Sequence, residues 1–62
     1  MTVRNLPEYA GNYPFWVVRH VDGEFWFWGA YSGKDRAKAV ALDVDGYVWD
    51  NTEGEWTQCG TL

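Results

Sequence analysis

The dipeptide Asp22-Gly23 constrains the fold of this chain more than any other feature, because it separates two runs of aromatic and β-branched residues between positions 15 and 31. Asp-Gly is a favoured pair for the centre of a type I′ turn, which needs a positive φ at both residues. The sequence therefore predicts a β-hairpin with a two-residue loop, and such a loop sets the register. The expected pairs are Val21 with Glu24, His20 with Phe25, Arg19 with Trp26, Val18 with Phe27, Val17 with Trp28 and Trp16 with Gly29.

This register divides the hairpin into two faces, since side chains alternate along a strand. The more apolar face is expected to pack on the core, and it carries Trp16, Val18, His20, Phe25, Phe27 and Tyr31. The other face carries Phe15, Val17, Arg19, Val21, Glu24, Trp26, Trp28 and Ala30.

Small apolar residues follow the hairpin at the spacing of one helix face, namely Ala37, Val40, Ala41 and Val44. This spacing predicts an amphipathic helix with Ser32 as the N-cap residue and Asp35 as its partner in a capping box. Gly46 is expected to end the helix. The two alanines would let the helix lie close to a sheet that carries large side chains.

Residues 47–50 and 55–58 are expected to form a second, shorter hairpin around residues 51–54, in which Gly54 supplies a positive φ. The predicted fold is α+β: a small single domain with the element order β-β-α-β-β. In it, one helix packs on one face of a mainly antiparallel sheet of three or four strands. We assign residues 13–62 to this domain. Residues 1–12 are expected to be a loose arm or a strap in which Leu6 and Tyr9 cover an edge of the core.

The order β-β-α-β-β resembles that of the β-grasp family, to which the immunoglobulin-binding domain of protein G belongs. The resemblance is one of architecture, covers no sequence motif and implies nothing about function.

Aromatic residues make up 19% of the chain and include five Trp. A chain of this length buries only about 60% of its surface on folding, so these rings must supply much of its stability. The one cysteine, Cys59, cannot form an intrachain disulfide, and we interpret it as an apolar filler in a cytoplasmic protein. The N-terminus lacks the apolar stretch of a signal peptide and no apolar run is long enough to span a bilayer, so no membrane partner is expected.

The net charge is −4, which opposes direct binding to nucleic acid. All basic residues lie within the first 38 positions, and the charged residues after Lys38 are all acidic. A local negative field of this kind supports one alternative function, an acidic DNA mimic that inhibits a nucleic-acid-binding protein. Its surface would consist of Asp43, Asp45, Asp50, Glu53 and Glu55.

The chain carries no recognisable motif for catalysis or for a metal. Residues 29–34 are too short for a phosphate loop, and residues 43–46 lack the first and last ligands of a calcium loop. A zinc site or a nucleophilic pair would depend on His20 and Cys59, each the sole residue of its type. We therefore expect no enzymatic activity, no cofactor and no metal.

The surplus of aromatic residues is the lead to function, because a single helix covers only one face of a small sheet. The opposite face of the hairpin is expected to bind a protein partner, with Arg19 stacked on Trp26. The expected contact residues are Phe15, Val17, Arg19, Trp26 and Trp28.

Three further rings, Tyr47, Trp49 and Trp56, are expected to join either this face or the core. Three other hypotheses stay open. Most of the rings could serve stability as core or cross-strand clamps, the face could form a homodimer, or it could be a platform on which a sugar or a base stacks, although the chain lacks a basic groove for nucleic acid. The small size and the absence of catalytic motifs fit an accessory or inhibitor protein of a bacterium or a bacteriophage.

Overall fold

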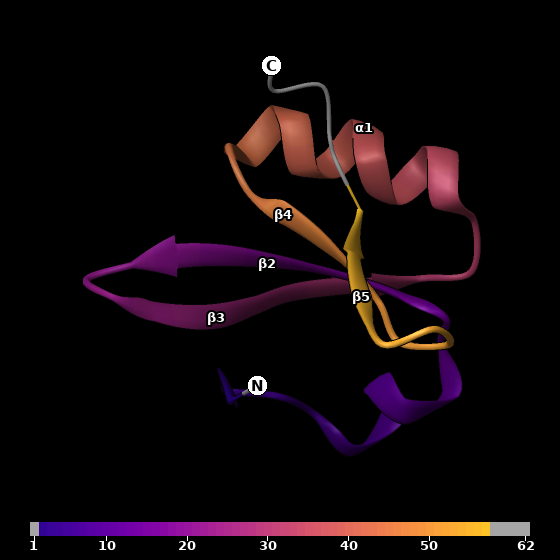
Figure 1. Ribbon diagram of the computed structural model, residues 1–62, viewed down its shortest axis with the longest axis horizontal. Helices are drawn as coiled ribbons and strands as arrows, with labels where there is room; N and C mark the ends of the chain where they lie inside the picture. Colours follow the sequence, from indigo (N-terminus) through magenta and orange to yellow (C-terminus); the bar gives the residue numbers. More distant parts are fainter. Residues whose placement is uncertain (1, 58–62) are drawn as a thin grey trace.

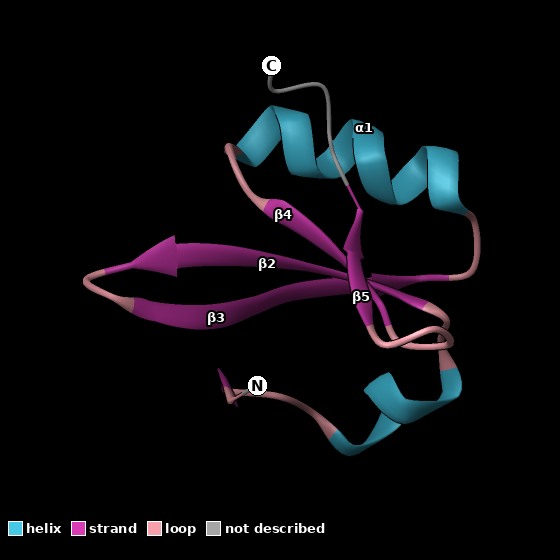
Figure 2. Ribbon diagram, in the orientation of Figure 1, coloured by secondary structure: helices cyan, strands magenta, loops and turns pink. Residues whose placement is uncertain are grey.

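The computed structural model describes residues 2–57, which form a mixed sheet of five strands with one α-helix on one side and a 3₁₀ helix on the other (Figures 1 and 2). The elements in chain order are β1 (Val3–Arg4), η1 (Glu8–Asn12), β2 (Phe15–Val21), β3 (Glu24–Tyr31), α1 (Lys34–Val44), β4 (Tyr47–Asp50) and β5 (Glu55–Thr57). The predicted α+β class and the order β-β-α-β-β from β2 to β5 are confirmed. The sheet has more strands than expected because β1 adds to it.

The strands lie in the order β1-β3-β2-β4-β5. β2 pairs antiparallel with both of its neighbours, so β3 and β4 run parallel to each other on either side of it. Parallel strands need a crossover connection, and α1 supplies it by passing over β2. β1 pairs parallel with β3 at the edge of the sheet.

The turn of the first hairpin is as predicted. Asp22 has a φ of 53° and Gly23 a φ of 79°, the signature of a type I′ turn. The expected register holds from the pair nearest the turn as far as Val18 with Phe27.

A β-bulge at Trp28 then shifts the register. Val17 pairs with Gly29, so the expected pairs of Val17 with Trp28 and of Trp16 with Gly29 are wrong. A glycine inside a strand often marks a bulge, because it adds no side chain to the sheet. The shift also moves Tyr31 to the face of Val17, where its ring lies over Gly29; a Cβ built on Gly29 would be 2.6 Å from the Tyr31 hydroxyl.

The helix packs on the face of the hairpin opposite to the one expected. Val17 and Val48 are fully buried against Ala37 and Ala41, with Phe15, Tyr31, Val40 and Val44 packed around them. Small helix residues can approach valines closely, whereas the rings of the other face are too large for such contact. The face expected beneath the helix therefore lies on the far side of the sheet, and it carries Trp16, Val18, His20, Phe25 and Phe27.

The N-terminal segment covers the middle of this far face. Trp16 is 8% exposed, and its Nε1 donates a 2.7 Å hydrogen bond to the carbonyl oxygen of buried Ala10 in η1. The ring of Tyr9 meets that of Phe27 edge-on, with 6.4 Å between centroids. Tyr9 and Leu6 remain largely exposed at their outer sides.

The sheet also curls toward its far face. The rings of Phe25 in β3 and Trp56 in β5 have centroids 5.0 Å apart, although β2 and β4 lie between their strands. Figure 1 shows β5 crossing the first hairpin at a steep angle. Strong twist of this kind is typical of small sheets.

The helix begins at Lys34, with Gly33 and not Ser32 as its N-cap residue. The predicted Ser32 cap is therefore wrong, because the chain is still extended at Gly33, and no side chain caps the first turn. Asp35 lies in that first turn, where the positive end of the helix dipole favours a carboxylate.

The helix ends where the sequence predicts. Asp45 adopts the left-handed conformation with a φ of 58°, and the Gly46 N–H donates to the Ala41 carbonyl oxygen over 2.7 Å. Gly46 is required here by a close approach, since a Cβ at this position would be 2.5 Å from the carbonyl oxygen of Val18.

The second hairpin is confirmed over β4 and β5, with Gly54 at a φ of 70°. Asp50 organises its turn, because Oδ1 accepts hydrogen bonds from the N–H groups of Thr52 at 2.9 Å and Glu53 at 3.0 Å. The predicted end of this strand at Gln58 and the interpretation of Cys59 lie outside the described residues.

Candidate binding surface on the first hairpin

The first hairpin extends well beyond the helix that covers its base (Figure 1). α1 shelters Val17 completely, but Arg19 and Val21, further along the same side of β2, are exposed. The register places Trp26 opposite Arg19 and Glu24 opposite Val21. These side chains therefore share the helix side of the sheet but lie past the end of its cover.

Two arginine–tryptophan pairs occupy this uncovered area. The guanidinium carbon of Arg4 is 5.4 Å from the ring centroid of Trp26, and that of Arg19 is 5.9 Å from Trp28. Trp26 is 40% exposed and Trp28 is 50% exposed. The expected stacking of Arg19 on Trp26 is therefore wrong: β1 places Arg4 beside Trp26, and Arg19 stacks on the bulged Trp28.

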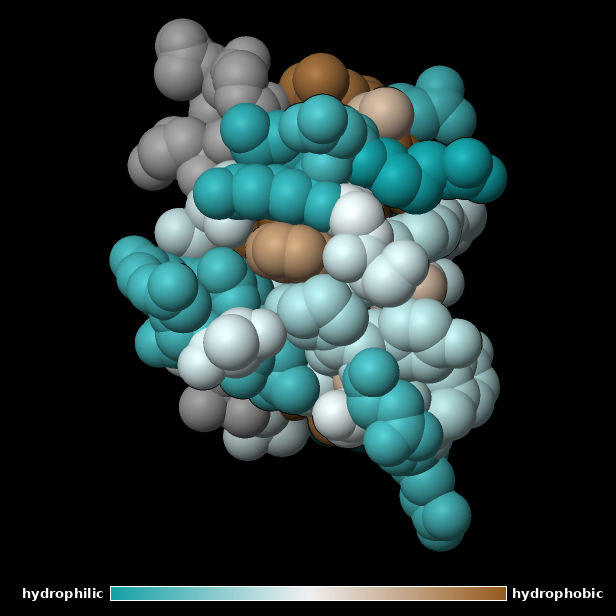
Figure 3. Space-filling view, turned by 90° about the vertical axis from the view of Figure 1, so that its right-hand side faces the viewer, coloured by the Kyte–Doolittle hydropathy of each residue, from teal (hydrophilic) through white to brown (hydrophobic). Residues whose placement is uncertain are grey.

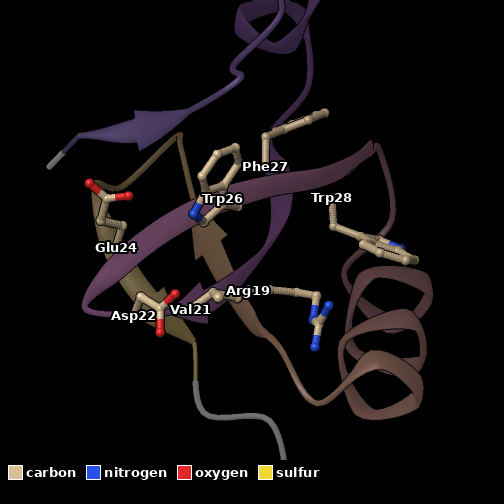
Figure 4. A pocket seen from close by; sticks show the side chains of 7 residues that line it. All are labelled: Arg19, Val21, Asp22, Glu24, Trp26, Phe27 and Trp28. Carbon is tan, nitrogen blue, oxygen red and sulfur yellow. The ribbon is translucent and has the colours of Figure 1, made fainter.

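Three of these side chains, those of Arg19, Trp26 and Trp28, help to line an open hollow of about 340 Å³, which we call the hairpin hollow (Figure 4). Figure 4 shows the Arg19 and Trp28 side chains projecting to the side on which the helix lies. The hairpin hollow is lined by Arg19, Val21, Asp22, Glu24, Trp26, Phe27 and Trp28.

The two arginines differ in their electrostatic partners. Arg4 forms an ion pair with Glu24 over 3.2 Å, and both side chains are about half exposed. Within residues 2–57, no carboxylate forms an ion pair with Arg19. The hairpin hollow thus combines two half-exposed indoles with one cation that has no counter-ion in the described part of the chain.

The structure brings together three of the five residues expected to bind a partner, namely Arg19, Trp26 and Trp28. Phe15 is half-buried against the helix and Val17 has no exposed surface, so Val17 belongs to the core and cannot contact a partner. The sequence predicts both on the surface only if the helix packs on the other side of the hairpin.

Sequence reasoning missed the contribution of Arg4. Its strand, β1, has only two residues, and it pairs with β3 across more than twenty positions of the chain. No local pattern could reveal this contact.

The acidic residues of the alternative hypothesis do not form one patch. Asp43 and Asp45 lie at the C-terminal end of α1, whereas the others lie at the β4–β5 turn, beyond the opposite end of β4. The side of the molecule shown in Figure 3, away from the hairpin tip, is mostly hydrophilic.

A second, more polar hollow of about 310 Å³ is lined by Lys34, Asp50, Glu53, Glu55, Trp56 and Thr57.

A second group of rings lies on the far face of the sheet, where Tyr47, Trp49 and Trp56 join Phe25. These three residues therefore belong neither to the hairpin hollow nor to the core beneath the helix. Tyr47 and Trp56 are 47% and 41% exposed. Phe25 also contacts the ring of exposed His20, with 4.9 Å between centroids.

Within residues 2–57, no three His, Cys, Asp or Glu side chains converge on a point that would suit a metal ion. No helix in the described part of the chain has the length and apolar character to cross a bilayer.

Comparison with models of known protein families finds no match, and comparisons with curated protein sequences and with solved structures find none either.

Proposed function

We propose that this is a small non-catalytic binding protein, and that it contacts a protein partner through the hairpin hollow. The observation that carries the proposal is the pair of half-exposed indoles of Trp26 and Trp28, each stacked with an arginine on the uncovered half of the hairpin. Trp and Arg are the residue types that most often dominate the energy of protein interfaces. An accessory or inhibitor role, in which the protein occupies a surface of a larger molecule, fits this arrangement.

The placement of these rings on strands supports the proposal further. A hairpin with a tight type I′ turn fixes the register of its two strands, so less backbone freedom is lost on binding than from a loop. The hollow of about 340 Å³ lies within the size range of ligand pockets, and its open shape suits one or two side chains of a partner.

The alternative of a DNA mimic receives less support. The division of the acidic residues between the two ends of β4 does not resemble the continuous line of phosphates along a nucleic-acid strand. A mimic would also show binding that weakens steeply with salt, because it depends on charge.

The test compares Trp28→Ala with Trp56→Ala, since both rings are about equally exposed but lie on opposite faces. Immobilised protein is exposed to an extract of its native host, and the retained protein is identified and its affinity measured. We expect Trp28→Ala and Trp26→Ala to lower the affinity at least tenfold, while Trp56→Ala retains it.

Urea unfolding of each variant verifies that the fold is intact. A partner that binds Trp28→Ala as tightly as the original chain contradicts the proposal, and a complex that dissociates with salt alone supports mimicry. Sedimentation at several concentrations tests the homodimer hypothesis, because self-association through this face should also require Trp28.

A further inference from the structure

We infer that the hairpin hollow recognises a segment of a partner protein in which a carboxylate stands next to a large apolar side chain. The inference rests on the proposed function and names the chemistry of the partner.

The stacked arginines exclude a cationic ligand. An exposed indole face usually attracts ammonium groups, and pairs of such rings form cages for them. Here the rings of Trp26 and Trp28 already hold guanidinium groups at 5.4 and 5.9 Å. A ligand cation would have to compete with these guanidinium groups for the rings, so the ligand is neutral or anionic.

Arg19 makes an anionic group preferable to a neutral one. Its guanidinium has no carboxylate partner within residues 2–57, whereas Arg4 is already neutralised by Glu24. When a guanidinium stacks on a ring, its N–H donors still point outward in its own plane. Two parallel hydrogen bonds to one carboxylate are the geometry that this arrangement favours.

The side chains around Arg19 determine which group the ligand should carry next to its carboxylate. Exposed Val21, Trp26 and Trp28 present apolar surface beside the guanidinium. Burying this surface against an apolar side chain of the ligand would contribute favourable binding free energy. Arg19 is the one cation of the lining, beside the carboxylates of Asp22 and Glu24, so the hollow has one guanidinium without an ion pair within residues 2–57 and not a row of cations. A nucleic-acid strand would need several, and the chain as a whole has a net charge of −4.

The experiment uses two short peptides that are blocked at both ends, Gly-Phe-Asp-Gly and Gly-Phe-Asn-Gly. They differ by one charge and are almost equal in shape. Each is titrated into the full chain while the indole N–H signals of Trp26 and Trp28 are followed by NMR. We expect the aspartate peptide to shift both signals and to bind about tenfold more tightly than the asparagine peptide, the effect of one charge-assisted pair.

Variants assign this difference to Arg19. Arg19→Gln is expected to abolish the preference for aspartate, and Arg19→Lys to retain part of it, because an ammonium keeps the charge but loses the planar fork. Arg36→Gln is the matched control, since it removes one positive charge from the exposed side of α1. It should leave the preference unchanged.

Three outcomes overturn the inference. Equal binding of the two peptides at these indoles means that the hollow accepts apolar segments without a carboxylate, and the proposed function then stands. If neither peptide shifts the indole N–H signals of Trp26 and Trp28, the inference is wrong. The capture experiment then tests the binding surface separately. Indole signals that move with protein concentration alone identify a second copy of the chain as the occupant.

Discussion

The indole of Trp16 is joined to the backbone of Ala10 by a 2.7 Å hydrogen bond, and both residues are buried. The bond ties the N-terminal segment to the face of the sheet that the helix does not cover. The Ala10 carbonyl oxygen also accepts from the Tyr13 N–H, over 3.1 Å, so one backbone group anchors both η1 and the start of the hairpin.

Replacing Trp16 by Phe should lower the free energy of unfolding by about 2 kcal/mol. The change removes a buried hydrogen bond and leaves a small void where the larger ring packed. Urea unfolding measures the loss, with Trp28→Phe as the control, because Trp28 is 50% exposed and should change stability much less. An equal decrease in the free energy of unfolding of the two variants would show that the contact with Ala10 contributes nothing to stability.

Gly46→Ala should lower the free energy of unfolding by about 2 kcal/mol. The added methyl group would lie 2.5 Å from the carbonyl oxygen of Val18, which is backbone and cannot move aside without disturbing β2. Gly11→Ala is the control, since nothing lies within 4 Å of a Cβ at that position. Thermal unfolding of the two variants side by side tests the difference, and similar melting temperatures would refute the close approach.

The N-cap assignment at Gly33 predicts opposite results at two neighbouring positions. Ser32→Ala should leave stability within about 0.5 kcal/mol of the original, because Ser32 does not cap the helix. Gly33→Asp should raise stability by about 0.5 kcal/mol, since its carboxylate would accept from free N–H groups at the positive end of the helix. The denaturant midpoints of the two variants measure these changes. A decrease of about 1 kcal/mol in the free energy of unfolding of Ser32→Ala would contradict the assignment and indicate that Ser32 caps the helix.

Asp50→Ala should lower stability by about 1 kcal/mol, because it removes the acceptor of two backbone N–H groups in the β4–β5 turn. Asp50→Asn should retain most of the original stability, since the amide oxygen can accept the same two hydrogen bonds. Glu53→Gln serves as the control for charge alone. Amide hydrogen exchange at Thr52 and Glu53 reports the bonds directly, and unchanged protection in Asp50→Ala would contradict the assignment.

The elements that were predicted correctly depend on neighbouring residues. The type I′ turn follows from Asp22-Gly23, the helix from the spacing of its alanines and valines, and the second turn from Gly54. In each case the conformation is selected within a few residues, so the amino-acid pattern is enough to indicate it.

One error is local, since the helix has Gly33 and not Ser32 as its N-cap residue. The other errors involve contacts between distant parts of the chain. The bulge at Trp28 changed the register and moved Tyr31 to the other face, and β1 reached β3 from the start of the chain. The two faces of the hairpin are both rich in large side chains, so alternation alone could not indicate which of them the helix would cover.

The same distinction holds for the binding surface. The amino-acid order by itself determined that Arg19, Trp26 and Trp28 would lie on one strand pair near an exposed turn, because local turn geometry and strand alternation require it. Only the tertiary structure decided that Val17 is covered, that Arg4 stacks on Trp26 and that Arg19 forms no ion pair within residues 2–57. Those outcomes depend on how far one short helix extends along the hairpin and on where a distant two-residue strand docks, and neither is encoded in the residues nearby.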